Sequence, residues 1–261
     1  MGLSLTRQAV HAAYGWGRAQ DWPGALALLG EAAAAGEPDA ARQLALVTQD
    51  DLTRLLTPPE PQWQAGPSRI AIGRGFAPPG FADWLIDRAK DRLDEATVEE
   101  EVAGQTLRTA RTFFFPPREC DLVLAILQHR AAALTGIAPQ FHEPPSVISY
   151  EVGQEFRPHV DFIDPDIAAY RSELDRSGQR TATFVTYLND DFDGAETVFP
   201  ELALTFRGSP GDAIFFANVL PDDTPDRNTI HAALPPTRGR KWVLSQWIRN
   251  KPFLYAREAL D

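Results

Sequence analysis

His159 and Asp161, a histidine and an aspartate two residues apart, are the best candidates in this chain for binding a metal. Side chains two apart on a β-strand point to the same face, so an imidazole and a carboxylate can reach one point there. Such a pair is common on protein surfaces, so alone it is weak evidence. His231 offers a third ligand, just before a turn at residues 232–236. Two histidines and one carboxylate leave three coordination positions open, which predicts a site for non-haem Fe(II).

Lys241 follows His231 by ten residues and begins an apolar strand pattern at residues 241–249. Alternation along this strand puts Lys241, Val243, Ser245 and Trp247 on one face. An unpaired buried ammonium is costly, so Lys241 must either reach solvent from an edge strand or pair with an anion. Beside a metal triad we favour the anion, because a dicarboxylate that chelates the metal at one end needs a cation at the other.

A set of short motifs occurs in a fixed order between Arg69 and Arg249. They are Tyr150-x-x-Gly153, His159-x-Asp161, Arg180-x-x-Thr183, Tyr187-Leu188-Asn189, Gly194-x-Glu196-Thr197-x-Phe199-Pro200, Gly211-Asp212-Ala213-Ile214-Phe215-Phe216, His231, and Gly239-x-Lys241-Trp242 with Trp247. With these motifs, about two thirds of the chain resembles the catalytic domain of prolyl 4-hydroxylases, within the 2-oxoglutarate- and Fe(II)-dependent dioxygenases. Ala195 and Ala233 stand where that family commonly has glycine, and Phe156 where it often has tyrosine.

The resemblance implies a role for each matching residue. His159, Asp161 and His231 would be the catalytic residues that hold Fe(II). Lys241 would bind the distal carboxylate of 2-oxoglutarate, with Tyr187 and Thr197 as hydroxyl donors, and Tyr150 would face the metal pocket. Each of these three hydroxyl residues has the alternative of a satisfied core residue.

Arg180 and Trp247 match family positions that contact a peptidyl proline and the strand around it. Trp247 shares the face of Lys241, which favours a place in the pocket. Arg180 has the opposite parity from Tyr187, so it reaches the cavity only if its strand begins with a bend or bulge. Otherwise it is an exposed arginine after a turn. Residues 164–179 and 218–228 are acidic and rich in turn residues. We expect them to form loops that flank the mouth of the active site and determine substrate specificity.

The activity that the resemblance implies is hydroxylation of an unactivated C-H bond, with release of succinate and CO2. The expected cofactor is Fe(II), the co-substrates are 2-oxoglutarate and O2, and ascorbate is a further candidate. The preferred substrate is a prolyl residue in a peptide or protein; free proline or another small molecule comes next. The alternative from another class is a catalytically silent jelly-roll module that binds a partner.

Composition and charge restrict the partners. The 261 residues are 44% hydrophobic and 23% charged, which is typical of a globular protein. The formal net charge of −11 repels phosphate, so we expect neither a nucleic acid nor a membrane as partner. The single cysteine, Cys120, cannot form an internal disulfide, and we see neither a secretory signal nor a bilayer-spanning apolar run. We therefore expect a cytoplasmic location.

The fold expected is α+β, mainly β: a double-stranded β-helix, or jelly roll, with supporting helices. Strands separated by Gly, Pro and Asp turns indicate a β-sandwich or barrel with helices packed outside, and the resemblance implies the jelly roll. Residues 1–57 are rich in alanine and leucine and predict about three helices, with one unit resembling a Sel1 or tetratricopeptide repeat. Residues 58–68 carry four prolines and predict a linker to the catalytic domain at 69–261. We expect the helices to cover an edge of that domain; the alternative is a peptide-binding module.

Overall fold

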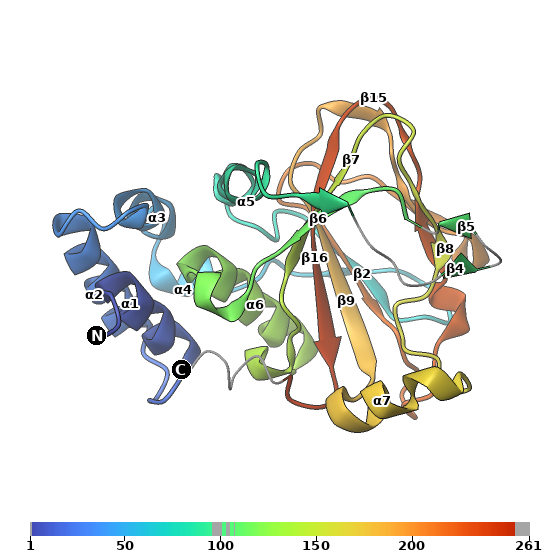
Figure 1. Cartoon of the computed structure of the whole chain (residues 1–261), viewed down its shortest axis with the longest axis horizontal. Coiled ribbons are helices and arrows are strands. Elements are labelled where there is room, and N and C mark those ends of the chain that lie inside the picture. Colours follow the sequence, from blue (N-terminus) through green and yellow to red (C-terminus); the bar gives the residue numbers. More distant parts are fainter. Residues whose placement is uncertain (1, 96–100, 103–104, 107, 254–261) are drawn as a thin grey trace.

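The computed structural model describes residues 2–95, 101–102, 105–106 and 108–253. Within these ranges, antiparallel strands form two sheets that face each other, with helices on the outer side of the larger sheet (Figure 1). The strands of the larger sheet are β1 (Gln62–Trp63), β2 (Ile70–Gly73), β3 (Asp94–Glu95), β6 (Arg111–Phe114), β7 (Ser146–Tyr150), β9 (Arg180–Tyr187), β13 (Ala213–Ala217) and β16 (Lys241–Arg249). Their spatial order is β1-β2-β13-β9-β16-β7-β6-β3.

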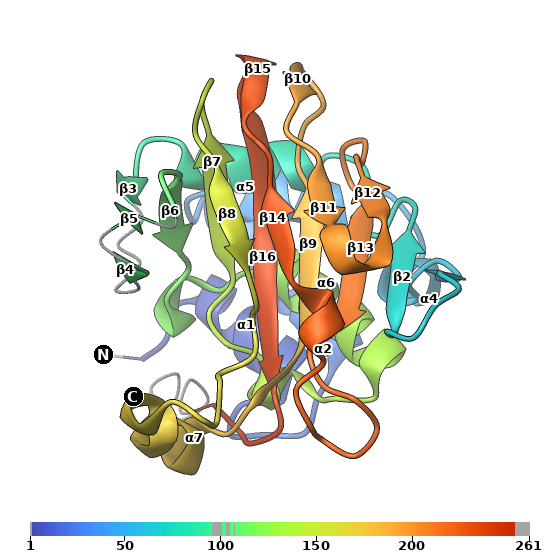
Figure 2. The ribbon, with the colours of Figure 1, turned by 90° about the vertical axis from the view of Figure 1, so that its right-hand side faces the viewer.

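The smaller sheet faces the larger one and lies in front of it in the view of Figure 2. Its strands, in spatial order, are β12 (Leu204–Phe206), β11 (Thr197–Phe199), β14 (His231–Ala233) and β8 (Phe156–His159). Two two-stranded sheets complete the described strands: the hairpin of β4 (Glu101–Val102) with β5 (Gln105–Thr106), and the pair of β10 (Phe192–Gly194) with β15 (Pro236–Gly239). This mainly β architecture with supporting helices confirms the predicted fold class.

Strand β16 separates the two hydrophobic cores of the molecule. It is central in the larger sheet, so alternate side chains pack into different layers. Val243 belongs to the core between the two sheets, and Leu244 belongs to the core between the larger sheet and the helices. Apolar residues on both faces therefore let this strand support the helical layer on one side while its other face borders the space between the sheets.

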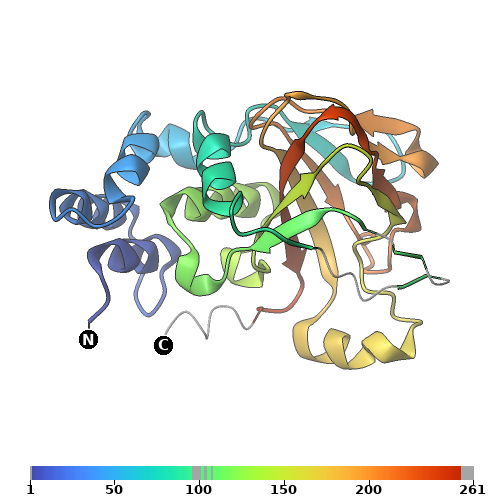
Figure 3. The same cartoon turned by 45° about the horizontal axis from the view of Figure 1, so that its top comes forward.

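The helices gather on the outer side of the larger sheet, as Figure 3 shows, except for α7, which lies beyond the end of the sheets. Their bounds are α1 (Leu5–Tyr14), α2 (Trp22–Ala34), α3 (Ala40–Val47), α4 (Leu52–Leu56), α5 (Phe81–Ala89), α6 (Leu122–Thr135) and α7 (Arg171–Ser177). Short 3-10 turns occur at Pro117–Glu119, Pro139–Phe141, Ala168–Tyr170, Pro200–Leu202 and Arg227–Thr229. None of the described helices has the length and apolar character needed to cross a bilayer.

Helix α6 joins the first four helices to the sheet. Its Arg130 guanidinium is buried and donates to three main-chain carbonyls: Leu55 at 2.7 Å, Arg54 at 3.0 Å and Phe76 at 2.5 Å. Tyr14 of α1 also donates to Gln128 of α6 at 2.8 Å. The N-terminal helices and α5 and α6 share one hydrophobic core. The N-terminal helices thus pack against α6 on the outer side of the larger sheet, and the domain boundary at residues 58–68 stays a prediction.

Three details differ from the expectations. Residues 5–56 form four helices rather than three, because Asp51 starts a short extra one by accepting a hydrogen bond from the Arg54 main chain. The proline-rich segment contains the edge strand β1, which tolerates neighbouring prolines since its outer side needs no partner. The segment 164–179, expected as a loop, contains α7, whose last residue precedes Gly178 with φ of 73°.

Candidate active site

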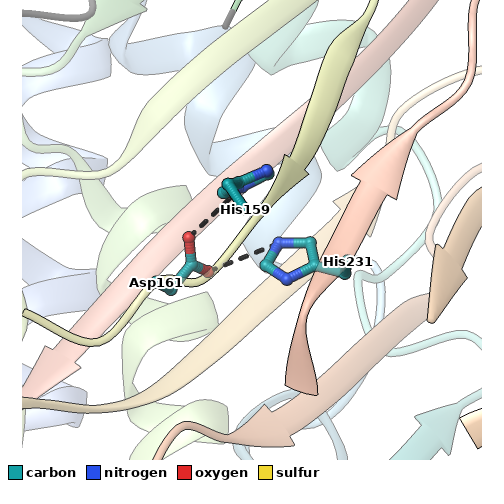
Figure 4. Close-up of side chains that lie close together, drawn as sticks. All are labelled: His159, Asp161 and His231. Atoms are coloured by element: carbon teal, nitrogen blue, oxygen red, sulfur yellow. Dashed lines mark ion pairs between the residues drawn. The ribbon is translucent and has the colours of Figure 1, made fainter. Parts of the chain in front are cut away.

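His159, Asp161 and His231 meet between the two sheets (Figure 4). His159 ends β8 and His231 begins β14, and the antiparallel pairing of these strands puts the two histidines opposite each other. One Asp161 carboxylate oxygen is 3.6 Å from His159 Nε2, and the other is 3.7 Å from His231 Nε2. One potential ligand atom from each residue lies within 4.8 Å of the others, which is close enough for all three to bind one ion.

The hydrogen bonds of both histidines point the correct nitrogen at that ion. His159 Nδ1 is 2.8 Å from the Arg157 carbonyl oxygen, and His231 Nδ1 is 3.0 Å from the Thr229 carbonyl oxygen. A carbonyl can only accept, so each Nδ1 carries the proton and each Nε2 keeps its lone pair. The three side chains therefore fit a divalent metal.

Aromatic rings limit the rotation of both imidazoles. Phe156 stacks on His159 with ring centroids 3.4 Å apart, while Phe199 and Phe216 pack against His231. Burial lowers the pKa of His231 to about 4, so this imidazole is neutral near pH 7, as metal binding requires.

Asp161 is held in place and kept ionised by its neighbours. Burial alone would raise the pKa of Asp161, but His231, His159 and Thr183 hold it well below its usual value. The Thr183 hydroxyl donates to Asp161 Oδ2 at 2.8 Å and accepts from the Asn218 amide at 3.0 Å. This chain of hydrogen bonds runs in one direction and fixes the carboxylate in the orientation that faces the histidines.

The triad borders a cavity of about 510 Å³, open mouth included, between the two sheets. Strand β16 supplies Lys241, Val243, Ser245 and Trp247 to its wall, which confirms the parity predicted for this strand. The other lining residues include Tyr150 and Thr197 of the predicted cofactor site, together with Arg108, Ser146, Ile148, Phe156, Val185 and Ala233.

Lys241 is a buried cation without a carboxylate in contact among the described residues. It is 1% exposed, and its Nζ donates to the Ala195 carbonyl at 2.7 Å and to Thr197 Oγ1 at 3.4 Å. Burial lowers the pKa of Lys241 to about 7. Ala195 has a positive φ of 59°, which explains why a glycine would also suit this position. A buried amine with only neutral partners is suited to receive an anion.

The three predicted hydroxyl donors are placed differently around Lys241. Thr197 contacts the ammonium directly, and the Tyr150 ring lies 5.5 Å from it at the cavity wall. Tyr187 does not line the cavity. Its hydroxyl donates to the Phe206 carbonyl at 3.0 Å and lies 3.0 Å from Thr197 Oγ1, with its ring 4.6 Å from Lys241 Nζ. Tyr187 therefore contacts Thr197 and Lys241 of the predicted cofactor site without lining the cavity itself.

A bulge brings the Arg180 side chain over the ring of Trp247, although Arg180 itself is not among the residues that line the cavity. Thr183 pairs with Trp247, but Arg180 pairs with Arg249 because Thr181 is left out of the register. The Arg180 guanidinium consequently lies 3.7 Å from the centre of the Trp247 ring. Its Nε donates to Glu143 at 2.7 Å and one terminal nitrogen to the same carboxylate at 3.3 Å. The Trp247 Nε1–H is buried without a partner among the described residues.

Sequence reasoning missed Arg108 and Glu143. Arg108 lines the cavity at 6% exposure, donates to Thr112 at 2.7 Å, and has an unpartnered Nε within the described structure. No spacing marked it, because it reaches the site through an isolated bridge to Phe156. Glu143 had a weak signal, as the only charged residue in the largely apolar stretch 137–148.

Comparisons with known proteins agree with this geometry. A family model described as the 2OG-Fe(II) oxygenase superfamily matches residues 145–249, a range that contains every predicted site residue. Probable prolyl 4-hydroxylase 3 of Arabidopsis thaliana is 30% identical over 203 residues, covering 69% of each chain. Prolyl 4-hydroxylase subunit alpha-1 of Gallus gallus is 34% identical over 173 residues, covering 65% of this chain and 33% of the relative.

A solved structure has the same fold. The viral collagen prolyl hydroxylase from Paramecium Bursaria Chlorella virus-1, in its 2OG complex, superposes with a TM-score of 0.55 at 26% identity. The match covers 69% of this chain and 95% of that one. By contrast, the chain spans 64% of the length of probable prolyl 4-hydroxylase 7 of Arabidopsis thaliana, so part of that relative has no counterpart in the matched region.

Proposed function

Because the chain belongs to the 2OG-Fe(II) oxygenase superfamily and has a prolyl 4-hydroxylase-like domain, we propose that it hydroxylates a prolyl residue in a peptide or protein. One arrangement carries the proposal. The two Nε2 atoms of the histidines, the ionised Asp161 and the carboxylate-free Lys241 all border one cavity. A module that only binds a partner has no need of a metal-ligand set together with a buried cation.

His159, Asp161 and His231 would hold Fe(II), and the ion would supply the activation of O2 that lets an unactivated C-H bond be hydroxylated while 2-oxoglutarate becomes succinate and CO2. Lys241 and Thr197 would bind the distal carboxylate of 2-oxoglutarate. The aromatic and aliphatic wall of the cavity, with Phe156, Ile148 and Val243, would keep bulk water away from the reacting atoms.

Arg180 and Trp247 support a peptide as the substrate. Glu143 takes one edge of the Arg180 guanidinium and Trp247 one face, so the second terminal nitrogen is left to donate to a substrate carbonyl. The partnerless Nε1–H of Trp247 is a second donor beside it. Two donors next to a flat aromatic ring suit a prolyl residue, whose ring packs on the indole while neighbouring carbonyls accept.

The charge of the mouth is more balanced than the sequence suggested. Arg227 forms ion pairs with Asp164 at 3.2 Å and Asp166 at 3.4 Å, which link the two segments expected at the mouth. Asp226 is buried and caps the turn at Asn228. We therefore expect a modest preference for basic or neutral peptides, since carboxylates of the acidic segment 164–179 are already paired with Arg227.

Two assays test the function. Purified protein with Fe(II) and 2-oxoglutarate should form succinate slowly without substrate, and faster with a proline-containing peptide that gains one oxygen by mass spectrometry. Ascorbate, proposed as a reductant that sustains turnover, can be omitted as a control. Oxygen added only to free proline or another small molecule would refute the peptide substrate. Absence of any succinate in metal-loaded protein would refute the oxygenase activity.

The predicted cytoplasmic location remains a proposal. It is supported by the cysteine count, because Cys120 is the single cysteine of the sequence and cannot form an internal disulfide that would need an oxidising compartment.

A further inference from the structure

Arg249, the last residue of β16, is a buried cation outside the cavity. It is 2% exposed, and three acceptors surround its guanidinium. Its Nε donates to Glu143 at 2.6 Å, and its terminal nitrogens donate to the Gly178 carbonyl and to Glu173 of α7, each at 2.7 Å. A side chain that is buried and satisfied on every edge is rigid, so whatever it contacts is held in a fixed position.

One of its contacts is shared with the proposed substrate residue Arg180. The bulge at Thr181 makes Arg249 and Arg180 cross-strand partners, and like charges in directly opposite positions repel each other. Glu143 Oε1 accepts from the Nε atoms of both arginines, at 2.6 Å and 2.7 Å. Glu143 therefore lies between them and relieves the repulsion.

A single carboxylate cannot balance two guanidinium groups, of which that of Arg249 is buried and that of Arg180 partly buried. The second negative charge comes from Glu173, so two arginines and two glutamates make a cluster with no net charge. The Glu173 side chain is 36% exposed and belongs to α7, in the segment 164–179 beside the proposed mouth. Gly178 ends that helix at φ 73° and ψ −178°, a conformation for glycine, and its carbonyl reaches Arg249.

We propose that Arg249 and Glu173 are positioning residues for substrate binding, which act through Glu143 to hold Arg180 against Trp247. This inference rests on the proposed function, since it needs Arg180 and Trp247 to contact the substrate. Removing the Glu173 charge leaves the cluster with a net positive charge, because Glu143 is then the single carboxylate between the two arginines. Arg180 then loses its fixed orientation over the indole. Helix α7, which supplies no lining residue to the cavity, is in this way coupled to peptide recognition.

The variant Glu173→Gln tests the idea with little risk to folding, because the residue is partly exposed and Glu143 keeps its contact with Arg249. With an uncharged proline-containing peptide, we expect the KM for the peptide to rise about tenfold, within the range for residues that couple to a site without touching the ligand. The kcat, the affinity for Fe(II) and the slow succinate formation without peptide should not change. Glu173→Asp keeps the charge and should bring the KM for the peptide part of the way back to the wild-type value.

The matched control is Asp175→Asn, which removes the same charge from the same helix, at an exposed residue with no side-chain contact to the cluster. It should change the KM less than twofold. An unchanged KM in Glu173→Gln, an equal rise in the control, or a parallel fall of kcat and peptide-free succinate formation would each overturn the inference. Wild-type protein that modifies no peptide would overturn the inference through the proposed function instead, so the two failures are distinguishable.

Discussion

His159 and His231, far apart in the sequence, are direct cross-strand partners on β8 and β14, with ring centroids 4.2 Å apart. Their Nδ1 atoms bond to carbonyls two residues earlier in each case, Arg157 and Thr229. The two strands thus present equivalent nitrogens from both sides of one point, and Asp161 closes the third side.

We expect His159→Ala, Asp161→Ala and His231→Ala each to abolish turnover and to weaken Fe(II) binding by orders of magnitude. Each substitution removes one of the three proposed metal ligands, while the two hydrophobic cores do not depend on the metal. Anaerobic calorimetry with Fe(II) measures the binding, and far-UV circular dichroism checks the fold. Full activity in one variant would remove that residue from the ligand set.

Thr183→Val should reduce the affinity for Fe(II) by about 10- to 100-fold, the usual effect of losing a hydrogen bond that orients a metal ligand. Valine keeps the shape of threonine but cannot donate to Asp161, so the carboxylate is free to rotate. Thr183→Ser should restore most of the affinity. Thr205→Val, at an exposed residue of β12, is the control and should bind iron as wild type does.

Lys241→Ala should raise the concentration of 2-oxoglutarate needed for half-maximal succinate formation by orders of magnitude, with iron still bound. A charge-assisted contact to a buried carboxylate is worth roughly 2 to 5 kcal/mol when truncated. Titration of succinate formation against 2-oxoglutarate, with iron affinity measured separately, gives the result. The exposed Lys90, which pairs with Asp87 on the surface, supplies a control, Lys90→Ala, which should leave the requirement unchanged. If Lys241→Ala also left it unchanged, the lysine would have only a packing role.

The affinity for 2-oxoglutarate should fall as the pH rises above about 7. Burial lowers the pKa of Lys241 to about 7 from its ordinary 10.5, so most of this amine is neutral at pH 8.5. A carboxylate beside it favours the ammonium form, so binding at that pH must take up a proton; below pH 7 the proton is already present and Lys241 adds no pH dependence.

Calorimetry at pH 8.5 in buffers of different ionisation enthalpy measures the proton taken up. The variant Lys241→Arg stays charged throughout this range and should take up none if it binds. Equal proton uptake in both proteins would assign the effect to another group.

Arg130→Met should destabilise the protein without changing its iron affinity. The guanidinium is the donor for three carbonyls of Arg54, Leu55 and Phe76, and its loss leaves buried acceptors without a partner. We expect a loss of about 3 kcal/mol in the free energy of unfolding, or roughly 6 to 12 °C in Tm. Thermal melts measure this, and Arg18→Met, at an exposed surface pair, should melt as wild type does. A normal Tm would mean that the N-terminal helices do not depend on this contact.

The sequence alone determined the relative positions of site residues that are close together along the chain. The two-residue repeat of a strand put His159 and Asp161 within reach of one point and aligned Lys241 with Trp247, and both arrangements occur in the structure. Period-two alternation depends on backbone geometry and not on the rest of the fold, so it can be read from a short stretch. The turn residues and short strand patterns predicted a β-sandwich or barrel in the same way, whereas the jelly roll itself was implied by the family resemblance.

Only the tertiary structure decided which residues meet across strands. The bulge that turns Arg180 toward Trp247 is a property of the pairing between β9 and β16. Threonine is an ordinary strand residue, so Thr181 did not predict the bulge. The meeting of Glu143 and Glu173 with Arg249, of Asn218 with Thr183, and the closing of the cavity by Arg108 likewise join distant segments. Such contacts depend on strand register and on packing between distant segments. Both result from many weak interactions along the whole chain, so no short sequence pattern predicts them.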